Sequence, residues 1–289
     1  MAAATAPPLV GLLADRLVIA FEPSVVSGVA ASRSLAGWRL RSVARAPLPA
    51  GALVPSPLDR NLAGTEEVRA AVAHVVKELG AERGRAAVLL PDGIGRTVLL
   101  DTTPGVAARE YARFRLASTL PYPDGEAVID VLPAGEGRVL AAAVRRPIVQ
   151  EYEAVIAACG LVQDRLDLAP LAVLAGRLRR AGDGPEVDVI LGEAALSLAA
   201  FRRGVLRVFR SRRRDPGPEE ATRVAEEADR SALLAGDGAA PVLRLMGAGA
   251  GGLALDLAQR GRDAEVVAPP VAPVPAEAAE LSWLAAALA

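Results

Sequence analysis

A run of glycines late in the chain is the first place where the sequence could do chemistry. Residues 247–252 read Gly-Ala-Gly-Ala-Gly-Gly and follow directly on a strand expected over residues 242–246. Glycines in this position let the backbone approach a phosphate, because no Cβ atom stands in the way. The same pattern also ends many strands and begins the next helix, so both uses stay open and the structural one is favoured.

Carboxylates and single reactive residues give weaker evidence of chemistry than the glycine run does. Glu126 and Asp130 lie four residues apart, but they flank and enter a predicted strand and need not face each other. A structural hydrogen-bonding role is therefore favoured over acid–base chemistry. His74 is the only histidine and Cys159 the only cysteine, which excludes catalytic triads, Cys-His pairs and multi-histidine metal sites within this chain. We expect no catalytic residue and no metal site.

The composition is that of a globular protein with cores of small aliphatic side chains. Apolar residues make up 52% of the 289 residues and aromatic residues 3%, and this length is sufficient for two lobes. The net charge of -1 gives no overall attraction to nucleic acid or anionic lipid. We recognise neither a signal peptide nor an apolar stretch of ~20 residues, so we expect a soluble cytoplasmic protein.

The densest local charge is a basic run over residues 202–214. It contains seven arginines and one aromatic residue, Phe209, and Phe201 directly precedes it, so binding of single-stranded nucleic acid is poorly supported. A solvated face of a β-hairpin is the favoured interpretation. Contact with anionic lipid or with an acidic partner stays open.

The elements that must position these residues occur in a repeated order. Each half of the chain begins with short antiparallel-looking strands and continues into α/β units, which predicts two similar α/β lobes beside a cleft. The first half has strands over residues 9–13, 17–21, 25–30, 37–46 and 86–90 and a helix over 65–80. The second half has strands over residues 187–191, 194–201, 205–209 and 242–246 and helices over 219–234 and up to 259.

A compact segment lies between the halves, over residues 104–162. It is predicted to hold helices over 106–119 and 148–159 and strands over 127–132 and 138–144, with a Pro-x-Pro bend at 121–123. We therefore place an inserted subdomain at residues 105–165 and a second lobe at 185–276. The first lobe is residues 1–104 with 166–184, and a C-terminal helix over 277–289 is expected to pack back on it.

Several short motifs, in this order and spacing, resemble PilM, the actin-like protein of the type IV pilus assembly machine. The match extends over almost the whole chain, and its most specific part is Leu-Pro-Tyr-Pro at 120–123 with Glu126 and Asp130. The resemblance implies an actin-like (ASKHA) two-lobed α/β fold with a small inserted α+β subdomain of the PilM/FtsA kind. The other matched segments are residues 10–12, 46–53, 88–91, 141–152, 159–167, 227–234 and 246–250.

The resemblance also identifies a nucleotide site that has lost its polar residues. In the first phosphate loop Leu13 stands in place of aspartate, Asp15 in place of glycine and Ala20 about where lysine is expected. In the second loop Ile190 replaces aspartate and Leu196 replaces threonine, although Gly192 remains. Leucine and isoleucine cannot bind Mg²⁺, which takes oxygen ligands. We predict a pseudo-ATPase without a bound cofactor, in which only the turn at Gly247 and Gly249 survives.

The function that the resemblance implies is protein binding. PilM-like proteins hold the N-terminal cytoplasmic tail of PilN, a single-span membrane protein, in a groove between the first lobe and the inserted subdomain. The same role here means a cytoplasmic scaffold in a pilus inner-membrane complex for motility, peripheral to the membrane, in a homo-oligomeric ring with other machine components. The residues expected at the groove are Pro91, Tyr111, Leu116, Pro121, Tyr122 and Arg145.

Three other functions are kept as alternatives. One is the cytoplasmic platform component of a type II secretion system (GspL-like), a family that continues into a membrane span that we do not recognise here. A second is a still active actin-like ATPase or sugar-kinase relative, which Leu13 and Ile190 argue against. A third is a filament former like FtsA, which would require a basic amphipathic terminal helix, and the last residues lack one.

Overall fold

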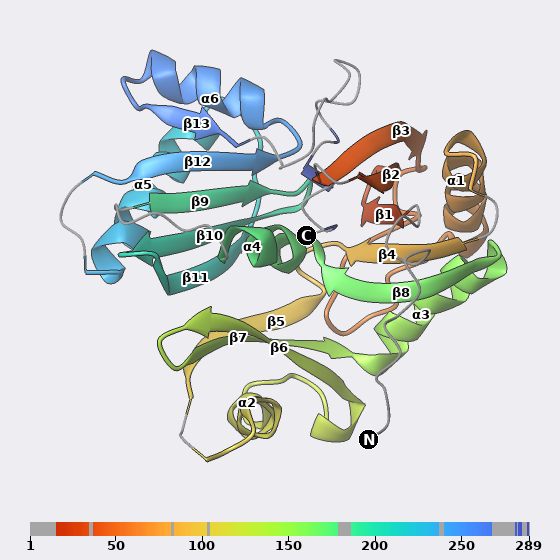
Figure 1. The fold of residues 1–289 in the computed structure, drawn as a ribbon, viewed down its shortest axis with the longest axis horizontal. Coiled ribbons are helices and arrows are strands. Elements are labelled where there is room, and N and C mark those ends of the chain that lie inside the picture. Colours follow the sequence, from red (N-terminus) through yellow and green to blue (C-terminus); the bar gives the residue numbers. More distant parts are fainter. Residues whose placement is uncertain are drawn as a thin grey trace, which may run out of the picture.

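Two five-stranded sheets with the same strand order form the frame of the molecule (Figure 1). The computed structural model describes residues 16–34, 37–81, 84–102, 105–178, 186–236, 240–267, 281, 283, 284 and 288. The strand expected over residues 9–13, with Leu13, and the neighbouring Asp15 lie outside these ranges.

The first lobe is built on the sheet β3-β2-β1-β4-β8, in which β1–β4 and β4–β8 are parallel and the other pairs antiparallel. Helices α1 and α3 pack on one face, and α4 packs on the other. The predicted helix near residue 65 is confirmed as α1, with Glu66 and Glu67 in its first turn. The elements are β1 (Arg16–Glu22), β2 (Val25–Ser34), β3 (Gly37–Pro47), β4 (Gly84–Leu90), β8 (Leu161–Leu168), α1 (Thr65–Glu78), α3 (Arg146–Ala158) and α4 (Ala169–Leu178).

The second lobe repeats this arrangement with the order β11-β10-β9-β12-β13. Its parallel and antiparallel pairs fall at the same places, and α5 and α6 cover one face. The repeated topology predicted from the sequence is confirmed: the two lobes are α/β units with the same strand order. The elements are β9 (Glu186–Leu191), β10 (Ala195–Arg202), β11 (Val205–Arg213), α5 (Glu220–Leu234), β12 (Val242–Gly247), α6 (Ala250–Gln259) and β13 (Ala264–Val266).

The inserted subdomain is a three-stranded sheet with the order β5-β7-β6 and one covering helix, α2. It comprises residues 95–145, so the boundaries predicted at 105 and 165 were wrong. Strand β5 precedes the predicted start, while α3 and β8 belong to the first lobe because α3 packs into that core and β8 pairs with β4. Its elements are β5 (Gly95–Asp101), α2 (Ala108–Ala117), the 3-10 turn η2 (Asp124–Glu126), β6 (Ala127–Gly135) and β7 (Arg138–Arg145).

Helix α4 lies between the two large sheets and connects the lobes (Figure 1). Its residues Ala172 and Leu174 share one apolar cluster with Val18 of the first lobe and Ile190 of the second. The described residues near the C-terminus, Leu281, Trp283, Leu284 and Leu288, are buried in this cluster. The predicted C-terminal segment therefore packs on both lobes at these four positions.

A buried ion-pair network also joins α4 to the second lobe. Arg177 Nε donates to Asp188 Oδ2 of β9 at 3.0 Å, and the guanidinium also pairs with Glu186. Arg244 of β12 reaches Glu186 from the other side at 3.3 Å. Burial raises the pKa of Asp188 to about 6, although Arg177 and Arg244 both favour its charged form. The orientation of α4 on the second lobe therefore depends on charges that are shielded from water.

Candidate functional site

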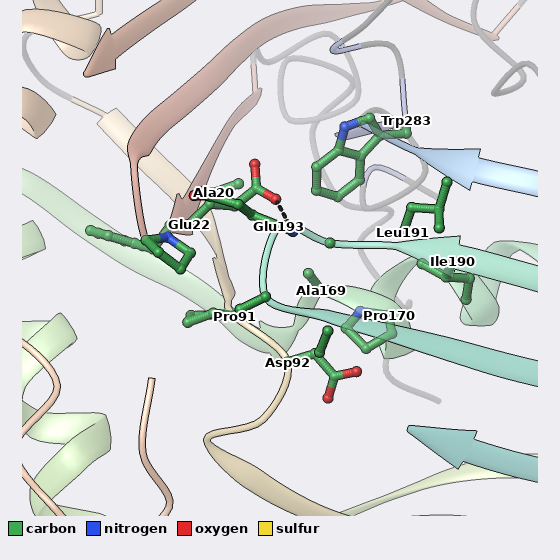
Figure 2. A pocket seen from close by; sticks show the side chains of 15 residues that line it. Ala20, Glu22, Pro91, Asp92, Ala169, Pro170, Ile190, Leu191, Glu193 and Trp283 are labelled. Atoms are coloured by element: carbon green, nitrogen blue, oxygen red, sulfur yellow. Dashed lines mark hydrogen bonds between the residues drawn. The ribbon is translucent and has the colours of Figure 1, made fainter. Parts of the chain in front are cut away.

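A small cavity lies between the two lobes, beside Ile190 and Gly192 of the second predicted nucleotide loop (Figure 2). It is bounded by the ends of β1 and β4, the start of α4, the turn between β9 and β10, and Trp283. Its volume is about 30 Å³. That is space for one or two water molecules, whereas ligand pockets usually measure about 300–1,000 Å³.

Two glutamates connect the lobes across this cavity. The Glu193 backbone N–H donates to Glu22 Oε1 at 3.0 Å, and the Ser24 N–H donates to Glu193 Oε2 at 2.9 Å. Burial raises the pKa of Glu22, and the charge of Glu193 adds to this, while the Glu193 N–H opposes it. Both carboxylates are therefore engaged in protein contacts.

Asp92 makes a second connection at the end of β4. Its Oδ2 accepts from Ser197 Oγ of β10 at 2.6 Å and from Ser211 Oγ of β11. Sequence reasoning missed Glu22, Asp92 and Glu193 as site residues. The available signal was that each lies at or just after the end of a strand beside the cleft. In the described part of the chain, no three His, Cys, Asp or Glu side chains come together as metal ligands would.

The apolar replacements predicted in the nucleotide loops are packed into the cores. Ala20 and Ile190 belong to the cluster around α4, and Leu196 packs with α5 in the second lobe. Ile190 is 4% exposed and Leu196 8%. None of these three side chains has an oxygen atom that could bind Mg²⁺.

Arg214 fills the space between the loops of the second lobe. Its Nε donates to Glu220 Oε1 at 2.6 Å, and its Nη1 donates to the Gly192 carbonyl at 2.9 Å and more weakly to the Ala248 carbonyl at 3.4 Å. The side chain is 12% exposed. An internal cation therefore connects the β9–β10 turn, the glycine turn and the start of α5. Its contacts could not be inferred from spacing, because they join residues far apart in the chain.

The packing of the second lobe explains why a glycine stands at position 247. Gly247 has φ +108°, and a Cβ atom there would lie 2.1 Å from the Leu191 carbonyl oxygen. Gly249 has φ +81°, and a Cβ atom there would lie 3.5 Å from its nearest neighbour, Arg214 Nη2. Close approach of β12 to β9 thus accounts for Gly247 without a nucleotide.

Replacing Gly247 with alanine should lower the free energy of unfolding by at least about 2 kcal/mol, because of the clash and the positive φ. Gly251→Ala is the matched control, since Gly251 lies in α6 with open space around it. We expect that control to be neutral or to stabilise by up to about 1 kcal/mol. Urea unfolding measures both, and equal stability of the two variants would refute the packing role of Gly247.

A larger groove lies between the inserted subdomain and the first lobe, with a volume of about 420 Å³. We call it the subdomain groove. Its walls are aliphatic, and its polar residues are Asp130, Arg165 and Asp167, the last two of which form an ion pair. Burial raises the pKa of Asp167, and Arg165 opposes this. The wall residues include Val128, Val131, Leu132, Ala142, Leu166 and Leu171.

The groove was expected between these two parts, but the residues predicted for it lie elsewhere. None of the six lines the subdomain groove. Leu116 and Tyr122 are buried in the subdomain core under α2, and Pro91 borders the interlobe cavity. The structure therefore does not place these three residues in the subdomain groove, and contact of any of the six with a partner stays a prediction.

The other three predicted residues are more accessible. Pro121 is exposed, and the Tyr111 hydroxyl accepts a hydrogen bond from Arg115 Nη1 at 2.8 Å. Arg145 donates to Glu126 Oε2 and to the Leu58 carbonyl, both at 2.6 Å. Arg145 thus attaches the subdomain to the first lobe. The period-two alternation of β6 and β7 was the available signal for the lining of the subdomain groove, because most of its residues on these strands are turned away from the α2 core.

Comparison with known proteins places this geometry among actin-like folds. No protein-family model matches the sequence, and no curated protein matches it. A chain of the PilM–PilN type IV pilus biogenesis complex is similar in structure, with a TM-score of 0.71 at 22% identity over 94% of this chain and 96% of that one.

Two further solved structures show weaker similarity. The cytoplasmic domain of EpsL, an inner membrane component of the type II secretion system of Vibrio cholerae, has a TM-score of 0.52 at 10% identity, over 80% of this chain and 82% of that one. A Bacteroides thetaiotaomicron protein with an actin-like ATPase fold and unknown function has a TM-score of 0.56 at 11% identity, over 91% and 94%. Within the described ranges, no helix is long and apolar enough to cross a membrane.

Proposed function

We propose that this chain is a non-catalytic PilM-like scaffold of a pilus inner-membrane complex that holds the N-terminal tail of a PilN-like single-span protein. The observation that carries the proposal is structural similarity over nearly the full length of both chains, including the inserted subdomain. Through such a partner the chain would lie at the membrane without crossing it, in a ring with other components of the machine.

The subdomain groove has the chemistry that such a tail requires. Its aliphatic walls on β6, β7, β8 and α4 can bury two or three apolar side chains, each contributing about 1.5–3 kcal/mol when fully covered. Asp130 and Asp167 lie among these walls and supply acceptors for the N–H groups of an extended segment. The groove therefore favours a short, largely apolar peptide over a nucleotide.

Loss of nucleotide binding is the second half of the proposal. It is supported by Ile190 and Leu196 in the cores and by Arg214 between the loops. We expect calorimetric titration with ATP and Mg²⁺ to give no saturable heat. Mg²⁺-dependent binding in the micromolar range would refute a pseudo-ATPase, and a known actin-like ATPase titrated in parallel validates the assay.

A pull-down with the tail peptide of a co-encoded single-span membrane protein tests the binding role, with the reversed-sequence peptide as control. Specific retention supports the proposal, and no retention by folded protein contradicts it. A platform component of a type II secretion system is the second candidate, on the weaker similarity to EpsL. Retention of the tail of a secretion-system protein, without retention of the pilus tail, would favour this second candidate.

A further inference from the structure

Two unpaired sheet edges face each other on one side of the molecule. Strand β5 is the end strand of the subdomain sheet and pairs only with β7, while β11 is the end strand of the second-lobe sheet and pairs only with β10. The two strands lie in contact without pairing within the described ranges (Figure 1). Each edge therefore presents backbone N–H and C=O groups that another strand could use.

An open groove of about 540 Å³ separates the two edges where Gly95, Arg96 and Thr97 approach Ser211, Arg212 and Arg213. We call it the edge groove. Farther along, Leu99 of β5 and Phe209 of β11 both pack against the apolar cluster around α4. Val54 and Pro55 of the first lobe add an apolar wall, and Val54 is 51% exposed.

The charge of the edge groove is basic. In the part of the chain that the structure describes, Arg96 and Arg213 are both exposed and have no hydrogen-bond or ion-pair partner. Arg213 lies on the same side of β11 as Ser211, which bonds to Asp92 of the first lobe, so its side chain faces the groove. Arg212 projects to the opposite side and pairs with Glu227. Asp92 is the one carboxylate of the lining, and it is engaged by Ser197 and Ser211.

We propose that the edge groove binds an extended acidic peptide, which adds as a strand to β5 or β11 and places carboxylates on Arg96 and Arg213. This site is separate from the subdomain groove and uses none of its residues. The backbone groups of an edge strand can hydrogen-bond to the backbone of a bound peptide. Two arginines without partners can form ion pairs with its carboxylates. A small phosphate anion would use the arginines but neither strand edge. The basic run over residues 202–214 thereby gains a role through Arg213.

The test is a selection of displayed random ten-residue peptides on the full chain, repeated on the double variant Arg96→Glu/Arg213→Glu. We expect the selected peptides to carry at least two acidic residues and to bind the double variant at least about tenfold more weakly. Arg202→Glu/Arg203→Glu is the matched control, since it changes the net charge equally at the exposed β10–β11 turn. We expect it to bind like the wild type.

Backbone N-methylation of the selected peptide separates strand addition from charge attraction. Methyl groups on alternate residues should abolish binding in one register and leave it unchanged in the other, because only one edge of an added strand faces β5 or β11. The proposal is overturned if the selected peptides lack acidic bias or bind the double variant equally. It is also overturned if both registers bind, or if only inorganic triphosphate binds. Ala142→Phe, which fills the subdomain groove, should not affect binding of the acidic peptide to the edge groove. Loss of acidic-peptide binding can therefore be told apart from loss of tail binding.

Discussion

Replacing Arg177 with methionine should lower the free energy of unfolding by about 3–5 kcal/mol. Arg177 carries the only positive charge of α4 and pairs with Asp188 and Glu186 on β9. The Asp188 side chain is fully buried, so its charge cannot be hydrated when the arginine is removed. The substitution therefore weakens the junction between α4 and the second lobe.

Arg109→Met is the control for this substitution, because the Arg109–Asp130 pair is mostly exposed, with side chains 64% and 73% accessible. It should change stability by about 0–1 kcal/mol. Denaturant unfolding measures both variants, and equal losses would contradict the buried network as the source of stability.

The deficit of Arg177→Met should also depend on pH. The pKa of Asp188 is already raised to about 6 in the folded protein, and loss of Arg177 raises it further. Since the folded-state pKa lies above the ordinary value, the folded protein takes up a proton as the pH falls, and the unpaired charge disappears. We therefore expect the full deficit near about pH 8 and a smaller one near about pH 5.

Replacing Ala142 with phenylalanine should reduce binding of the tail peptide at least about thirtyfold, a loss of about 2 kcal/mol. Ala142 lies on β7 between Ala141 and Ala143, which face the α2 core, so its own side chain points into the subdomain groove. A phenyl ring there occupies volume that the peptide needs. The protein itself has room for the ring, because the groove is open.

Ala117→Phe is the matched control, since Ala117 is exposed on α2, away from the subdomain groove. We expect it to bind a fluorescent tail peptide like the wild type, as measured by anisotropy. Equal binding by Ala142→Phe and the wild type, with both proteins folded, would remove the subdomain groove as the tail site.

Much of the fold could be predicted because local patterns and global pairing agree. The strands of both lobes alternate or are continuously apolar, and α1 carries acidic residues at its start. Strands β5 and β8 were missed, and both lie at sheet edges with polar residues such as Arg96, Asp164 and Asp167. Which sheet β8 joins is decided by its pairing with β4, which no local pattern contains.

Features of the candidate site that depend on residue type could be predicted from the sequence. Features that depend on contacts between distant residues could not. The apolar character of Ile190 and Leu196 argues directly against metal binding, and both are buried. The filling of the site by Arg214 depends on partners in three separate turns. Tyr122 was assigned to the groove from a motif, but a large apolar residue in a motif serves a core as readily as a surface.

Calorimetric titration of the tail peptide from a co-encoded PilN-like protein into the wild-type chain tests the central claim most directly. We expect saturable one-to-one binding with a negative change in heat capacity, because the peptide buries apolar surface in the subdomain groove. Absence of binding to folded protein would contradict a scaffold that holds such a tail.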